Sequence, residues 1–205
     1  MHRLLICSTA AVLLAMPALA SAAPRQIDVR DDFFAPKRPP ARDLQAGASF
    51  TWSSAGGTFN EHNVRQDAKL FHSGNLTSNL RFSIRASAGS FHYYCELHGS
   101  RRGGMSGVVK VRPIAVPDSS PDEALVRWAA ADTNTGSRFD VLYRVDNRRW
   151  KTWKSDTAKL QARFGHRNGP VDYRPRRHTY RVKVRSERRQ VAKRSGFSPA
   201  VTLNP

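Results

Sequence analysis

Four residues with metal-binding side chains follow one another in a fixed order in the first half of the chain. His62 comes first, and Cys95, His98 and Met105 follow within one short stretch. A thiolate, two imidazoles and a thioether form a soft nitrogen–sulfur ligand set that suits copper, and a Cys-His-His plane with a weak axial Met is the blue-copper electron-transfer arrangement. Zinc prefers four strong ligands, and methionine is a poor one. The residue types therefore predict a site for one copper ion.

Simpler explanations exist for some of these residues. A buried structural Cys95 would need neither a histidine three positions later nor Met105 ten positions later. A core role for Met105 is a more plausible alternative than a structural Cys95, because methionine often fills gaps in a core, but it remains the minor alternative to a ligand role. Two further histidines, His72 and His92, lie nearby in the sequence, and we expect both on the surface or behind the ligands rather than among them.

The cysteine count limits the class of protein. Only Cys7 and Cys95 occur in 205 residues, which excludes a disulfide scaffold and a four-cysteine zinc site. Residues 1–22 combine a basic start, a short apolar run and small residues, which predicts a cleaved secretory signal. The apolar run is too short for a comfortable membrane span. We therefore expect an exported protein, periplasmic or extracellular, without a membrane span after cleavage. Its single remaining thiol, Cys95, is expected to be bound in a site rather than free.

Short strands with alternating apolar and polar residues must position the candidate ligands. Gly, Pro, Asn and Ser clusters separate these strands, and no segment has a convincing amphipathic helical pattern. This pattern predicts a β-sandwich over residues 24–113, with Cys95 at a strand end and His98 and Met105 on the turn that follows. The expected strands in this domain lie at 27–29, 50–52, 80–84, 91–95 and 107–111.

A second strand-rich segment follows a stretch rich in proline, aspartate and serine. We expect residues 114–122 to be a linker and residues 123–205 to be a second β-domain, with strands at 125–128, 139–145 and 180–185. The predicted fold is therefore all-β, with two sandwiches in series.

The first domain resembles a plastocyanin-type cupredoxin. The resemblance covers residues 27–112 and depends on Phe-x-Tyr-x-Cys-x-x-His at 91–98, Gly-Met-x-Gly-x-Val at 104–109 and His-Asn-Val at 62–64. It implies a Greek-key β-sandwich that binds one copper ion in a type 1 site and transfers single electrons.

The resemblance also implies a role for each residue of the site. His62, Cys95 and His98 would be the equatorial ligands and Met105 the axial one, with Asn63 tying the first-ligand strand to the Cys95 loop. One feature departs from the family: six residues separate His98 from Met105, where plastocyanins usually have four.

The second domain resembles a fibronectin type III module, an immunoglobulin-like β-sandwich. Trp128 matches the core tryptophan of the second strand, and Tyr180 is the candidate for the tyrosine corner. Nothing in this domain indicates catalytic chemistry.

The charge indicates what kind of partner to expect. A formal net charge of +18 favours anionic partners, such as an acidic redox protein or an anionic envelope component. By analogy with the family, Arg101 and Arg102 would flank the docking surface for such a partner. Nucleic acid is not expected, because the chain has no motif for reading it.

Three functions are compatible with the sequence. The first is an electron carrier, the second is copper binding or delivery without electron transfer, and the third is an adhesive scaffold centred on the second domain. An enzyme is the least expected, because the chain has no further histidine cluster for a substrate-open metal.

Overall fold

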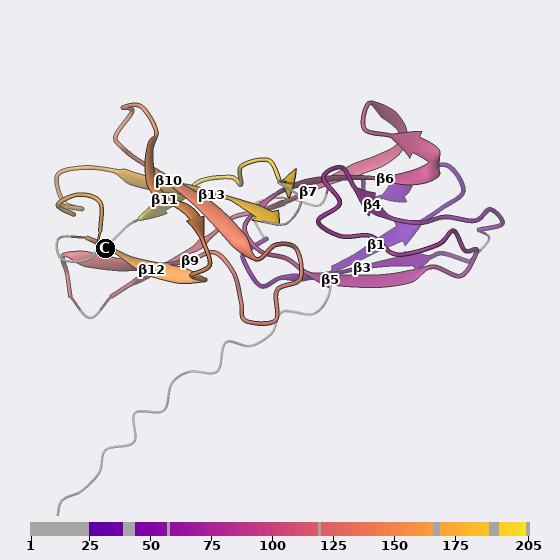
Figure 1. The fold of residues 1–205 in the computed structure, drawn as a ribbon, viewed down its shortest axis with the longest axis horizontal. Helices are drawn as coiled ribbons and strands as arrows, with labels where there is room; N and C mark the ends of the chain where they lie inside the picture. Colours follow the sequence, from indigo (N-terminus) through magenta and orange to yellow (C-terminus); the bar gives the residue numbers. More distant parts are fainter. Residues whose placement is uncertain are drawn as a thin grey trace, which may run out of the picture.

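The protein consists of β-strands arranged in two units that lie end to end (Figure 1). The computed structural model describes residues 25–38, 44–56, 58–118, 120–165, 169–188 and 193–203, and the predicted signal segment 1–22 lies outside them. Every regular element of the described residues is a strand, which confirms the all-β prediction. Among these residues, none forms a helix long and apolar enough to cross a membrane.

The first unit is a sandwich of two sheets. One sheet has the strand order β2-β1-β3-β5 and the other has the order β4-β6-β7. The strands β1 and β3 are parallel, whereas the other pairings in this unit are antiparallel. The bounds are Arg25–Val29 (β1), Phe34–Ala35 (β2), Ser49–Ser54 (β3), Arg65–Gln66 (β4), Arg81–Arg85 (β5), Gly89–Ser100 (β6) and Gly103–Val111 (β7).

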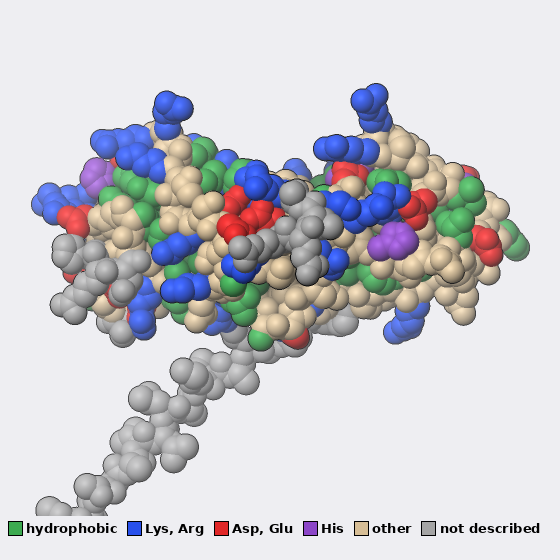
Figure 2. Space-filling model, in the orientation of Figure 1, with side chains coloured by type: hydrophobic (Ala, Val, Ile, Leu, Met, Phe, Trp, Pro, Cys, Tyr) green, Lys and Arg blue, Asp and Glu red, His purple; other side chains and the backbone are tan. Residues whose placement is uncertain are grey.

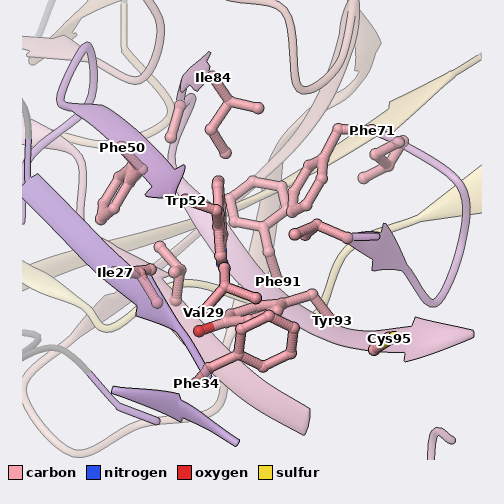
Figure 3. Close-up of a cluster of buried hydrophobic side chains, with 14 of the residues drawn as sticks. Ile27, Val29, Phe34, Phe50, Trp52, Phe71, Ile84, Phe91, Tyr93 and Cys95 are labelled. Carbon is pink, nitrogen blue, oxygen red and sulfur yellow. The ribbon is translucent and has the colours of Figure 1, made fainter. Parts of the chain in front are cut away.

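Aromatic side chains fill the space between these two sheets. Trp52 lies in the middle of the cluster, and its ring meets that of Tyr93 edge to face at 5.1 Å (Figure 3). Tyr93 meets Phe34 in the same way at 5.0 Å. All three are fully or almost fully buried, and burying a large apolar side chain contributes about 1.5–3 kcal/mol. Cys95 belongs to the same buried cluster but lies farther along β6 than Tyr93.

The second unit is also a sandwich of two sheets packed around one core. One sheet has three strands in the order β12-β9-β8. The other has the order β11-β10-β13-β14, and β15 also pairs with β13. The bounds are Ile114–Pro117 (β8), Glu123–Arg127 (β9), Arg138–Val145 (β10), Lys151–Thr157 (β11), Gln161–Gly165 (β12), Tyr180–Arg188 (β13), Lys193–Arg194 (β14) and Val201–Leu203 (β15).

Two residues singled out in the sequence have the expected places in this second unit. Trp128 is fully buried in its core. The Tyr180 hydroxyl, at the start of β13, donates a hydrogen bond of 2.9 Å to the Asp172 carbonyl and accepts one of 2.9 Å from the Arg174 N–H. This is the geometry of a tyrosine corner.

The structure differs from the prediction in the segment expected to be a linker. Residues Ile114–Pro117 form β8 and pair with β9 in antiparallel register. The proline-rich composition suggested an irregular segment, but Pro113 and Pro117 stand at the two ends of the strand, where a missing N–H does little harm. Between them, Ile114 and Val116 favour an extended strand.

A network of buried hydroxyl groups joins the two units. Ser87 Oγ lies 2.8 Å from Thr135 Oγ1 and 2.6 Å from Ser186 Oγ, and all three residues are fully buried. The Ala88 N–H adds a backbone hydrogen bond of 2.7 Å to the Trp128 carbonyl. Because β6 begins at the next residue, this junction is joined directly to the strand that carries Cys95.

Candidate metal centre

The hairpin of β6 and β7 contains an irregular stretch that presents the candidate ligands. The two strands pair regularly from Gly89–Val111 to Tyr94–Ser106, and the ladder resumes at Gly99–Gly104 after a shift in register. Residues 95–98 of β6 therefore leave the ladder. A bulge of this kind redirects side chains, which gives Cys95 and His98 room to face a common point.

The boundaries of this hairpin differ from those predicted. Cys95 was expected to end its strand, whereas β6 continues to Ser100 and the turn comes at residues 101–102. Met105 was expected on the turn and lies on β7. The longer spacing between His98 and Met105 thus lengthens the two strands and leaves the turn short.

Glycines allow the two strands to come this close. Gly104 has a φ of 72°, a left-handed conformation that L side chains rarely adopt, and a Cβ there would lie 2.5 Å from the His98 carbonyl oxygen. A Cβ on Gly99 would overlap the Met105 carbonyl oxygen. Side chains at these two positions would therefore push the hairpin apart at the level of the ligands.

Three of the four predicted ligands converge on one point. Cys95 Sγ lies 3.8 Å from His62 Nδ1 and 3.7 Å from His98 Nδ1, and the two Nδ1 atoms are 3.2 Å apart. One donor atom from each residue lies within 4.8 Å of the others, and the group can hold a metal ion.

The sulfur–nitrogen separations match what a bound metal requires. Metal–ligand bonds of about 2.3 Å to a thiolate and about 2.0–2.1 Å to imidazole nitrogens, at angles near 120°, bring sulfur and nitrogen about 3.8 Å apart. Both measured sulfur–nitrogen distances agree with this value. The sulfur–nitrogen spacing thus suits a bound metal ion, whereas the two Nδ1 atoms, 3.2 Å apart, are closer than the about 3.5 Å that the same geometry gives.

Met105 lies next to this group in the hairpin. It is fully buried in the same cluster as Cys95. On β7 it falls between Gly104 and Ser106, whose partners on β6 are Gly99 and Tyr94. Met105 therefore occupies the register position opposite the irregular stretch that carries Cys95 and His98.

His62 is held in place by its backbone and kept neutral by its surroundings. Its N–H and carbonyl exchange hydrogen bonds of 2.9 and 3.0 Å with Thr77, and the side chain is fully buried. Burial lowers the pKa of His62, and the nearby His98 lowers it further, against the opposing effect of Asp31. A neutral imidazole has a lone pair available for a metal.

A carboxylate lies behind His62. Asp31 Oδ1 is 3.6 Å from His62 Nε2, too far for a hydrogen bond, and it accepts hydrogen bonds from the Phe59 and Asn60 N–H groups at 2.8 and 2.9 Å. The Asn60 and Phe59 bonds lower the pKa of Asp31, so it is ionised at neutral pH. Its negative charge favours a proton on Nε2, which leaves Nδ1 free to face Cys95.

Asn63 connects the two segments that supply ligands. Its Oδ1 accepts a hydrogen bond of 2.9 Å from the Glu96 N–H, and its Nδ2 donates one of 2.7 Å to Glu96 Oε2. Since Asn63 follows His62 and Glu96 follows Cys95, these bonds fix the two ligands relative to each other.

Glu96 is the centre of a second polar cluster beside the ligands. Its carboxylate pairs with the Arg65 guanidinium and lies 2.8 Å from His72 Nε2. The hydrogen bonds from His72, Arg65 and Asn63 lower the pKa of Glu96 to about 2. The carboxylate is therefore charged over the whole physiological range and holds its three neighbours around it.

Sequence analysis overlooked Asp31 and Glu96. Neither has a spacing relative to the ligands that would reveal it, since Asp31 approaches from the loop after β1 and Glu96 acts through Asn63. His72 and His92 lie outside the ligand group, His72 at Glu96 and His92 with its Nδ1 3.0 Å from Asp67 Oδ1.

The surface near the ligands is both apolar and basic. His98 is partly exposed, whereas His62 and Cys95 are buried. Leu97, beside it, exposes 59% of its surface, and Arg101 and Arg102 are exposed on the hairpin turn. Arg101 also forms a salt bridge of 3.2 Å with Asp67. Of the three candidate ligands, His98 is thus the one that is accessible from the surface.

Comparisons with known proteins add little to this picture. No family model and no curated protein matches the chain. Among solved structures, the chain is similar to the crystal structure of chicken CNTN1 FN1-FN3 domains, with 11% sequence identity and a TM-score of 0.31, over 89% of this chain and 69% of that one. Similarity at this level carries no functional argument.

Proposed function

We propose that the protein is an exported type 1 copper protein that holds one copper ion and transfers single electrons to or from a protein partner. The observation that carries this proposal is the convergence of Cys95 Sγ, His62 Nδ1 and His98 Nδ1 at separations of 3.2–3.8 Å. Met105 would be the axial ligand. Copper is favoured over zinc because thiolate and thioether donors are soft and methionine binds zinc poorly.

Each part of the site has a task in this proposal. When bound, copper would supply an ion that cycles between two oxidation states one electron apart. His62 is neutral and has the charge of Asp31 behind it, and Asn63 holds the segment of His62 to the Glu96 backbone next to Cys95. The aromatic cluster around Trp52 packs against Tyr93 and so holds β6 in place. A cage held on all sides limits the movement of its ligands, which favours fast electron transfer.

Burial of the ligands favours an electron carrier over a protein that delivers copper. Handing the ion to an acceptor would require an approach to the ligands, but His62 and Cys95 are fully buried. An electron needs only a short path through His98, which is partly exposed. The apolar surface of Leu97 and the charges of Arg101 and Arg102 then fit a docking partner with an acidic rim.

The absorption spectrum of the copper-loaded mature protein tests this function. We expect an intense visible thiolate-to-copper band that Cys95→Ser abolishes, and a Met105→Leu variant that keeps the band but has an altered reduction potential. His92→Ala is the matched control, because it removes a nearby histidine that pairs with Asp67 and is not a ligand. A colourless copper complex, or colour that survives Cys95→Ser, would refute the proposal. Rapid transfer of the copper to a chelator would favour delivery instead.

A further inference from the structure

The outer face of the larger sheet in the second unit is basic. Alternate residues of a strand point to opposite faces. On β13, Val182 and Val184 are buried in the core, so Arg181, Lys183 and Arg185 lie on the outer face. Lys and Arg side chains gather over the region where Figure 1 labels β10, β11 and β13 (Figure 2).

Two aromatic rings separate these cations. The Trp150 ring centroid is 4.9 Å from Arg144 Cζ and 4.3 Å from Lys183 Nζ. The Phe197 ring centroid is 4.8 Å from Lys183 Nζ and 4.9 Å from Arg185 Cζ. The order across the face is therefore Arg144, Trp150, Lys183, Phe197, Arg185. We call these five residues, with Arg181 opposite Arg144 on β13, the cationic ladder.

The ladder has more positive charge than its own carboxylates neutralise. Arg185 is bound by Asp140 at 2.6 Å. Within the described residues no ion pair joins Arg144, Arg181 or Lys183 to a carboxylate. Arg144 Nε is buried without a hydrogen-bond partner, and burial together with the neighbouring Arg144 lowers the pKa of Lys183. The rings thus hold like charges close together where an anion would relieve their repulsion.

We propose that the cationic ladder binds a linear acidic polysaccharide through its carboxylate or sulfate groups. Side chains two residues apart on one face of a strand are spaced by about 6.8 Å, which gives a row of cations along β13. A row fits a chain with repeated charges better than a single small anion. Trp150 has cations against its ring already, so it offers no platform for the base stacking that single-stranded nucleic acids use. This site is separate from the copper centre and does not depend on it.

The test compares matched variants of the full-length mature protein. Binding to dextran sulfate and to polygalacturonate is measured by calorimetry at about 0.15 M salt, a concentration that screens diffuse attraction, with neutral dextran as the blank. The ladder variant is Arg144→Gln with Lys183→Gln. The control variant is Arg81→Gln with Lys110→Gln, which removes one exposed Arg and one exposed Lys from the first unit. Both variants have the same net charge.

We expect the ladder variant to bind one or both polysaccharides about tenfold more weakly, because each lost charge-assisted contact removes binding free energy. The affinity of the control variant should change less than about twofold. Arg181→Gln, which breaks no contact with an aromatic ring, is a second variant should the ladder variant fold poorly, and it should weaken binding by about threefold. Equal losses in ladder and control variants would overturn the proposal, because binding would then follow net charge alone. It would also be overturned by stronger, ladder-dependent binding to vesicles of phosphatidylcholine and phosphatidylglycerol, or to a single-stranded oligonucleotide.

Discussion

Replacing Asn63 with alanine should loosen the metal centre without removing any ligand. Asn63 is almost fully buried, and its side chain makes three hydrogen bonds: two with Glu96, at 2.9 and 2.7 Å, and a longer one of 3.3 Å to the Gly74 carbonyl. The substitution leaves the Glu96 N–H without its acceptor and removes the donor that faces the Glu96 carboxylate.

The size of the effect follows from these three bonds. A neutral hydrogen bond contributes about 1 kcal/mol and one to a charged group about 1.5–3 kcal/mol. Water can reach the exposed Glu96 carboxylate and replaces part of its lost bond. We therefore expect the metal-free Asn63→Ala protein to lose about 2 kcal/mol of unfolding free energy. Because the hydrogen bonds of Asn63 also position His62 and Cys95, the affinity for copper should fall by about 10–100-fold, as for other groups that hydrogen-bond behind metal ligands.

Two measurements separate the structural effect from the effect on the ligands. Urea unfolding of the metal-free protein, followed by tryptophan fluorescence, gives the stability, and competition with a chromophoric chelator gives the affinity for Cu(I). Asn75→Ala is the control, because Asn75 lies in an exposed loop near Asn63 and Glu96. A variant that loses stability but binds copper within about threefold of the parent would show that Asn63 does not position the ligands.

Three further predictions concern other parts of the molecule. Gly104→Ala should weaken copper binding and broaden the visible band, because a Cβ there lies 2.5 Å from the His98 carbonyl oxygen; an unchanged spectrum would show that the hairpin can adjust. Asp31→Asn should raise the reduction potential of the copper centre by some tens of millivolts, since a negative charge behind His62 stabilises the more positive ion, and voltammetry that finds no shift or a decrease would contradict this. Burial alone would raise the pKa of Asp140, but the Asp156 N–H and Arg185 outweigh it and lower the pKa. Asp140 thus stabilises the fold above the unfolded pKa of about 3.9, and this contribution is lost as the pH falls through the lower folded value. In urea titrations, Asp140→Asn should therefore lower the free energy of unfolding by about 2 kcal/mol at pH 7 and by progressively less below about pH 4. A difference that stays constant at all pH values would assign the effect to packing.

The sequence predicts most of the strands because their apolar residues alternate. The segment 139–145 matches β10 (Arg138–Val145), and 180–185 lies within β13 (Tyr180–Arg188). Prediction failed where another signal dominated, as in β8, whose flanking prolines made a strand resemble a linker. It also failed at residues 96–106, where the pairing of two strands after a bulge depends on glycine contacts that no local pattern reveals.

The candidate site was predictable to the extent that it depends on residue types. Cysteine, histidine and methionine are uncommon enough in this chain that His62, Cys95 and His98 could be grouped by their chemistry. Asp31 and Glu96 could not be found in this way, because carboxylates are frequent and only the approach of distant loops brings these two to the ligands.

The hydrogen-bonded junction between the two units has a consequence for how the protein would work in its surroundings. The strand β6 begins where Ala88 binds the Trp128 carbonyl, and Cys95 lies six residues after Gly89, about 20 Å along an extended strand. An anchored second unit would therefore hold the proposed copper centre at a fixed offset from its support, without a flexible tether. Confinement of this kind raises the local concentration of one redox partner for another, so that a partner attached to the same polymer would meet His98 far more often than one in free solution.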